Sequence, residues 1–100
     1  MNNKEQIDWE AINYAIALYL NLGFKYQPKD KKSMLDEFGK EISDKVDEIY
    51  DYSTGFNVDW RTDTMESIKL KLEESLKQNY GGLNEQSINI LKRCFSYTWR

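Results

Sequence analysis

Apolar residues near the N-terminus recur at steps of three and four, which places their side chains on one face of a helix. This stripe consists of Trp9, Ile12, Ile16, Tyr19 and Leu20. Further apolar residues fill the adjoining face, so we expect most of this helix to be buried. Gly23 can end a helix in the left-handed conformation, and Pro28 disfavours its immediate resumption. The pattern predicts a first helix over about residues 4–22.

A second stripe keeps helical spacing for four turns and consists of Leu35, Phe38, Ile42, Val46 and Ile49. Either Asp30 or Ser33 can supply the N-terminal cap, and Gly39 lowers the helix propensity slightly. We therefore expect one second helix, which ends in the stretch 53–55. Residues 56–60 then alternate apolar and polar, as a short strand or an ordered loop does.

The remaining chain predicts two further helices joined by a glycine turn. Asp63 and Glu66 fit a variant of the reciprocal capping arrangement at the start of the third helix. Its apolar stripe is Met65, Ile68, Leu72 and Leu76, and it stops at the pair Gly81 and Gly82. Asn84 can cap the fourth helix, whose stripe is Ile88, Leu91 and Phe95.

The last residues, 94–100, also alternate in a way that suits a strand, and we favour helix over strand there. A chain of 100 residues is large enough for one hydrophobic core. The sequence thus predicts an all-α protein, one helical domain over residues 1–100, built as a compact bundle of about four helices.

No apolar stretch approaches the ~20 residues that a membrane span needs, and the N-terminus lacks the pattern of a signal peptide. We therefore expect a mature chain that begins at or near Met1, no association with membranes, and a cytoplasmic location. The single cysteine, Cys94, excludes an intramolecular disulfide and agrees with that location.

The residue content argues against most familiar active sites. The chain has no histidine, which is the commonest general base and the commonest side-chain ligand of catalytic zinc. Cys94 therefore has no histidine to activate it, and its apolar neighbours favour a place in the core. No glycine-rich phosphate loop occurs. The many acids leave a carboxylate-pair enzyme or an acid-ligated magnesium site open, although their spacing favours neither. We expect no catalytic residues, no metal site, no cofactor and no enzyme activity.

The most unusual segment runs from residue 44 to 63. Its acids are Asp44, Asp47, Glu48, Asp51, Asp59 and Asp63, against only Lys45 and Arg61, which gives a local charge of −4 within a chain of net charge −3. Aromatic residues that interfaces use as anchors lie between these acids. The residues that we expect to bind a partner are Asp47, Asp51, Tyr52, Phe56, Asp59 and Trp60.

This segment has a second interpretation, in which the acids form a solvated helix face and the rings cover an open end of the core. The glycine turn allows a further alternative, a helix-turn-helix regulator that reads DNA with Gln86, Ser87 and Asn89. Few basic residues follow to hold phosphates, so a plain helical hairpin is favoured and nucleic acid is not the expected partner.

Residues 83–100 resemble the closing helix and aromatic-basic tail of small bacterial immunity proteins, which neutralise toxins of contact-dependent inhibition and related polymorphic toxin systems. The resemblance implies a cytosolic protein that binds one cognate toxin by covering its active site or substrate-binding surface. An acidic surface would suit a basic nuclease. We therefore expect an antitoxin whose partner is a toxin domain, with a helix-turn-helix regulator or an adaptor protein as alternatives and the oligomeric state left open.

Overall fold

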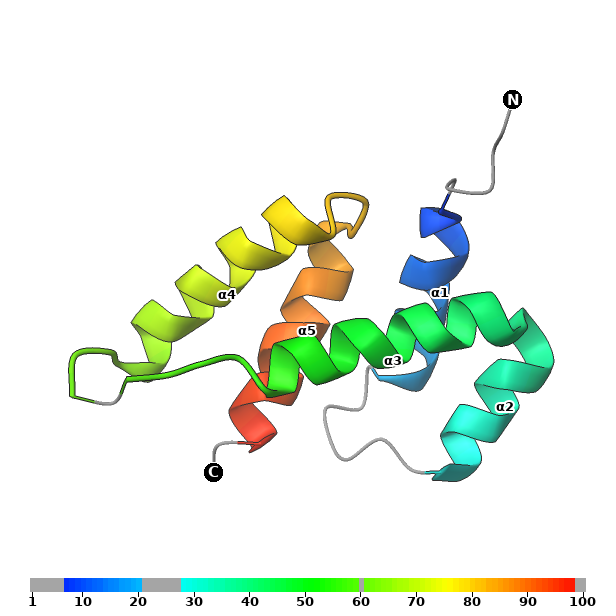
Figure 1. Ribbon diagram of the computed structural model, residues 1–100, viewed down its shortest axis with the longest axis horizontal. Helices are drawn as coiled ribbons and strands as arrows, with labels where there is room; N and C mark the ends of the chain where they lie inside the picture. Colours follow the sequence, from blue (N-terminus) through cyan, green and yellow to red (C-terminus); the bar gives the residue numbers. More distant parts are fainter. Residues whose placement is uncertain (1–6, 21–27, 60, 99–100) are drawn as a thin grey trace.

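The computed structural model of the chain describes residues 7–20, 28–59 and 61–98 (Figure 1). They form α1 (Trp9–Tyr19), α2 (Pro28–Phe38), α3 (Lys40–Thr54), α4 (Met65–Asn79) and α5 (Glu85–Thr98). The prediction of an all-α fold is confirmed, with five helices in these ranges where about four were expected. No helix in them is both long and apolar enough to cross a membrane.

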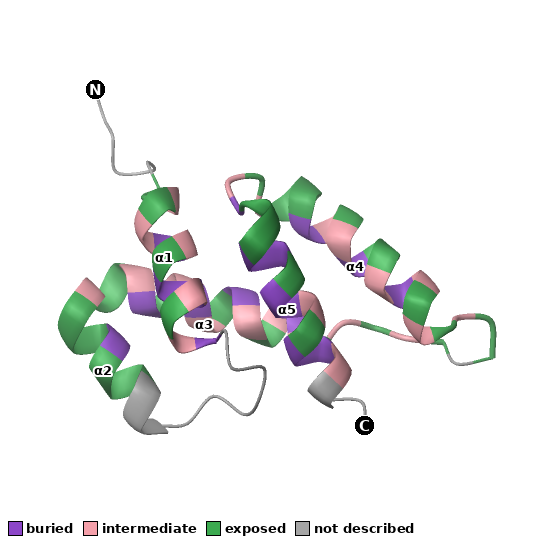
Figure 2. Ribbon diagram, turned by 180° about the vertical axis from the view of Figure 1, so that it is seen from behind, coloured by how far each residue is buried: buried purple, intermediate pink, exposed green. Residues whose placement is uncertain are grey.

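The last helix lies at the centre of the packing. α5 packs against α1, α3 and α4, while α3 also packs against α1 and α2. Figure 2 shows buried positions along α5 and on parts of the helices around it. The largest fully buried side chain is Phe95 of α5, and the core around it includes Ile16 of α1, Ile49 of α3 and Leu72 of α4. Full burial of each such side chain contributes about 1.5–3 kcal/mol.

The single second helix that we expected is two helices, α2 and α3. The break is at Gly39, whose φ of +90° lies outside the helical region and favours glycine. The apolar stripe continues across the break, which is why its spacing alone suggested one helix. Pro28 begins α2, a position that proline tolerates because its missing N–H would have no partner in the first turn. The proposed cap residues Asp30 and Ser33 therefore lie inside α2.

The other helix ends differ from prediction in smaller ways. α1 begins at Trp9, capped by Asp8, and ends at Tyr19, so residues 7, 8 and 20 of the predicted range 4–22 are not in the helix. Residues 4–6 and 21–22 lie outside the described residues. α4 is capped by Thr64, which exchanges hydrogen bonds with Ser67 instead of the expected pair Asp63 and Glu66. Asn84 caps α5 as predicted, through its Oδ1 and the N–H of Ser87.

Two ambiguous segments are now assigned over most of their length. Residues 56–59 form a loop without strand pairing, and residue 60 lies outside the described residues. Residues 94–98 belong to α5, so the helical alternative is confirmed there. Residues 99–100 lie outside the described part of the chain.

Candidate functional site

A groove runs along one side of α3 and combines two adjoining hollows. The larger, of about 830 Å³, lies between α3, the start of α1 and the break at Gly39. The smaller, of about 390 Å³, lies at the other end, where α3 approaches the end of α4. Ile7, Lys45 and Glu48 line both hollows, so we treat them as one feature, the α3 groove.

The amphipathic sequence of α3 explains why its outer surface is polar here. Its buried residues are Ser43, Val46, Ile49 and Ser53. The groove-lining residues follow another face at helical spacing: Glu41, Lys45, Glu48 and Tyr52. Along its whole length α3 carries five acids against two lysines. Of the α3 residues that line the groove, three are acids and two are lysines, and Trp9 and Ile12 of α1 lie opposite them.

The smaller hollow is lined by three aromatic residues from three separate parts of the fold, Trp9, Tyr52 and Tyr80. The rings of Tyr52 and Tyr80 meet edge to face with centroids 5.5 Å apart, and Phe56 stacks on Tyr52 at 6.0 Å. The Tyr52 hydroxyl is hydrogen-bonded to the hydroxyl of Ser75 and accepts a bond of 3.2 Å from the Asn79 side-chain amide. These contacts hold the Tyr52 ring in one orientation.

Glu48 places a carboxylate beside these rings. Its Oε2 accepts a hydrogen bond of 2.8 Å from the Tyr80 hydroxyl, and its Oε1 accepts one of 3.1 Å from the Lys45 ammonium. The bond from Tyr80, followed by that from Lys45, lowers the pKa of Glu48 from its ordinary value. Burial, helped by the Glu48 carboxylate, raises the pKa of Tyr80 to about 12. At neutral pH the hollow therefore contains an ionised carboxylate and a neutral phenol.

The residues proposed from the sequence do not all lie in this groove. Tyr52 lines it, and Phe56 stacks on Tyr52. Asp47 lines a separate hollow beside α2, where its Oδ1 lies 3.9 Å from the Lys31 ammonium. Asp51 is exposed on α3, and Asp59 lies in the following loop, where it accepts hydrogen bonds from Arg61. Trp60 lies outside the described residues.

Sequence reasoning did not select Glu48, Tyr80, Trp9 or Asn79. A signal for Glu48 was present, because Glu48 and Tyr52 are four residues apart in a helix and must share a face. No comparable signal exists for the others, since Tyr80 is 32 positions from Glu48 and their contact depends on the fold.

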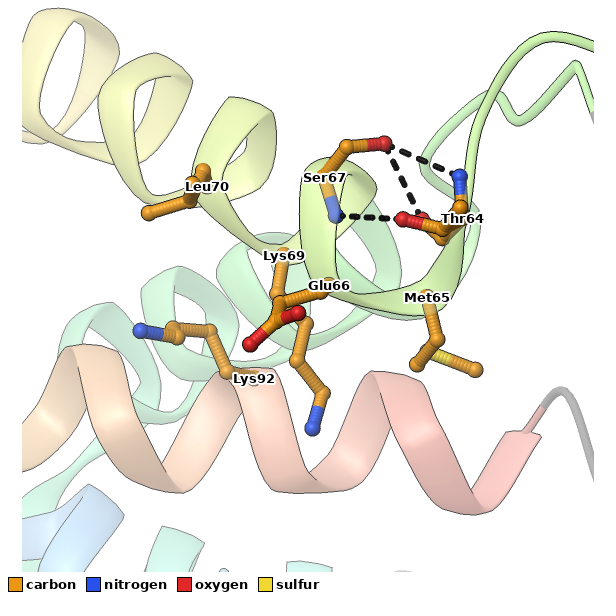
Figure 3. A pocket seen from close by; sticks show the side chains of 7 residues that line it. All are labelled: Thr64, Met65, Glu66, Ser67, Lys69, Leu70 and Lys92. Carbon is orange, nitrogen blue, oxygen red and sulfur yellow. Dashed lines mark hydrogen bonds between the residues drawn. The ribbon is translucent and has the colours of Figure 1, made fainter.

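A further hollow, of about 810 Å³, lies between the first half of α4 and α5 (Figure 3). Figure 3 shows Lys69 and Glu66 projecting from α4 and Lys92 projecting from α5. The Lys92 ammonium is bonded to Glu73 at 2.7 Å. Around this hollow the lysines outnumber the acids, whereas the α3 groove is lined by four acids and two lysines.

Cys94 and Ser87, which the sequence offered as a reactive thiol and a DNA-contacting residue, are both buried. Cys94 is a buried core residue, as expected, and burial raises the pKa of its thiol to about 11, so the nucleophilic thiolate is rare at neutral pH. The side chain of Ser87 is also buried, where its hydroxyl donates to Asn13 at 2.7 Å. A DNA reader built on α5 could thus use Gln86 and Asn89, which are exposed, but not Ser87.

Within residues 7–20, 28–59 and 61–98 no three side chains of the metal-binding types His, Cys, Asp and Glu come together as a metal site would require. Comparison of the chain with models of protein families, with curated proteins and with solved structures gives no match.

Proposed function

We propose that the protein acts by binding another protein, and that the α3 groove is the surface that the partner occupies. The observation that carries the proposal is the arrangement at Glu48, where an ionised carboxylate lies among Trp9, Tyr52 and Tyr80 in a groove lined by four acids and two lysines. Protein interfaces use aromatic side chains of this kind as anchors because they bury a large area at a small cost in conformational entropy.

The charge of the groove indicates a partner with a basic surface. The acids that line it are Asp8, Glu41, Asp44 and Glu48, and the lysines are Lys40 and Lys45. Each lysine is already paired with an acid of α3, Lys40 with Asp44 at 2.7 Å and Lys45 with Glu48 at 3.1 Å. The surplus of acids would attract a basic surface and accelerate association, with an effect that salt weakens.

The particular role that we propose is that of an immunity protein in the cytoplasm, which inhibits a bacterial toxin. A nuclease toxin must have a basic surface to hold the phosphates of its substrate, and an acidic groove would cover that surface. This role is the one that the resemblance of residues 83–100 implies. Inhibition would then occur by steric and electrostatic occlusion, without catalysis by this chain.

The immunity role predicts that a gene beside the one for this chain encodes a toxin domain, and the test is inhibition of that domain. We expect the purified protein to bind that domain and to stop its cleavage of nucleic acid in a gel assay. Failure of the neighbouring protein to bind would contradict the immunity role.

Variants of the groove test where binding occurs. The double substitution Glu41→Gln and Asp44→Asn should slow association and flatten its dependence on salt in stopped-flow measurements. Glu74→Gln is the matched control, because Glu74 is an exposed acid on α4 that does not line the groove. If both proteins associate with the toxin domain equally fast, the partner binds elsewhere.

A further inference from the structure

We propose that the smaller hollow of the α3 groove is a subsite for the side chain of an arginine presented by the partner. This inference rests on the proposed function, because it specifies which basic group of the partner the groove takes. The hollow has about 390 Å³ and is lined by Ile7, Trp9, Lys45, Glu48, Tyr52, Asn79 and Tyr80.

The Glu48 carboxylate is the group that would bind the guanidinium. Its Oε1 accepts one hydrogen bond, from Lys45, and its Oε2 accepts one, from Tyr80. Each carboxylate oxygen has two lone pairs, so each can accept a further donor. A guanidinium offers two parallel N–H groups at the spacing of the two oxygens, and both oxygens can therefore be used at once.

The side chain of Glu48 is 52% exposed, so a ligand can reach it from solvent. Two hydrogen bonds also hold the Glu48 carboxylate in place, one from Tyr80 at the end of α4 and one from Lys45 in the preceding turn of α3. A carboxylate held in this way loses little freedom when it binds an arginine.

The rings make arginine a better occupant than lysine. A guanidinium is planar and weakly hydrated, and it stacks on aromatic faces while its edge bonds a carboxylate. Trp9, Tyr52 and Tyr80 line the hollow beside Glu48, so both contacts are available to one side chain. An ammonium is more strongly hydrated and cannot bond both oxygens through a planar fork.

Lys45 already places an ammonium against Glu48, so a cation of the chain itself occupies part of this carboxylate. The Lys45 side chain is 29% exposed and the Glu48 side chain is 52% exposed. The ammonium uses one position on Oε1, so both oxygens can still accept a guanidinium while Lys45 keeps Glu48 in place.

The experiment is a titration of the isotope-labelled full chain with N-acetyl-arginine-methylamide, followed by the amide spectrum in NMR. We expect saturable shifts at the indole N–H of Trp9 and the side-chain amide of Asn79. The lysine analogue, N-acetyl-lysine-methylamide, should bind several-fold more weakly. Absence of saturable shifts, or equal affinity for the two analogues, would overturn the assignment.

Two substitutions separate the carboxylate from its surroundings. Glu48→Gln should weaken arginine binding about tenfold, because it removes a charge-assisted pair of hydrogen bonds. Tyr80→Phe keeps the ring and the Glu48 charge but removes one of the two bonds that hold the carboxylate in place, so affinity for the arginine analogue should fall less than in Glu48→Gln. Glu74→Gln is the control on α4 and should change nothing. Unchanged affinity in Glu48→Gln, or a loss in Tyr80→Phe as large as the loss in Glu48→Gln, contradicts a subsite at Glu48.

The result is distinguishable from a failure of the proposed function. If the toxin domain binds the groove but the arginine analogue does not, the subsite is wrong and the immunity role stands. If the arginine analogue binds as expected but the toxin domain is not inhibited, the hollow is a guanidinium site and the immunity role is wrong.

Discussion

At the scale of single residues, Asn13 connects the first helix to the turn between the last two. Its Nδ2 donates to the carbonyls of Trp9 at 2.8 Å and Gly82 at 3.0 Å. Its Oδ1 accepts from the N–H of Asn84 at 3.0 Å and from the hydroxyl of Ser87 at 2.7 Å. All four hydrogen-bonding positions of the amide are therefore satisfied.

Removal of the Asn13 side-chain amide should destabilise the fold, because Asn13→Ala leaves partly buried donors and acceptors without partners. We expect the free energy of unfolding to fall by about 1–3 kcal/mol, measured by urea denaturation. Glu10→Gln is the control, since Glu10 is exposed on the same helix and should change stability by less than about 0.5 kcal/mol. Equal stability of the two variants would show that the four bonds add nothing.

Gly82 allows the indole ring of Trp9 to lie directly against the backbone. A Cβ at this position would lie 2.0 Å from Cγ of Trp9, which no real contact permits. Gly82→Ala must therefore displace the ring, and we expect it to destabilise the protein by about 1–3 kcal/mol in urea denaturation. At the neighbouring Gly81 the nearest atom to an added Cβ is the Lys77 carbonyl oxygen at 3.4 Å. Gly81→Ala should be close to neutral, and similar losses in both variants would contradict this explanation.

At the scale of helices, the break at Gly39 decides where α2 ends and α3 begins. Nothing lies within 4 Å of a Cβ built there, so the cost of a side chain comes from the backbone alone, at a φ of +90°. Gly39→Ala should lower the free energy of unfolding by about 1–2 kcal/mol. Gly39→Asn should lose a similar amount, because at a ψ of 169° the residue lies outside the left-handed helical region that asparagine tolerates and in a region adopted essentially by glycine alone. If alanine is as stable as glycine in thermal unfolding, the break does not depend on this conformation.

Most of the helices were predictable because their apolar residues keep the spacing of a buried face, as Ile68, Leu72 and Leu76 do in α4. The division between α2 and α3 was not, since the apolar stripe passes through Gly39 without interruption. The cap of α4 was misplaced by one residue because Asp63 and Thr64 are both good caps. Asp63 instead bonds the Lys71 ammonium at 2.7 Å.

At the scale of the whole molecule, the candidate site depends on contacts that local patterns do not contain. The acid content of α3 and the aromatic character of Tyr52 were visible in the sequence. The approach of Trp9 and Tyr80 to Tyr52 was not, because it requires α1 and the end of α4 to lie on the same side of α3. Asp47 was assigned to the same surface as Tyr52, but a separation of five residues turns their side chains to different sides of a helix.

The link between α4 and α3 gives a prediction about how the molecule opens. α4 packs along α5, and near its C-terminal end Ser75 and Asn79 are hydrogen-bonded to the Tyr52 hydroxyl of α3. Tyr52→Phe keeps the ring in place but removes these bonds, which are worth about 1 kcal/mol each. Local opening of α4 should become easier, while the α1–α3–α5 contacts are untouched. We expect amide hydrogen exchange of Leu72 and Leu76 to accelerate about thirtyfold, the equivalent of the two bonds together, with Val46 and Ile49 of α3 changed much less. Uniform acceleration across all helices would instead mean that the hydroxyl supports the fold as a whole, and unchanged exchange would mean that α5 alone holds α4.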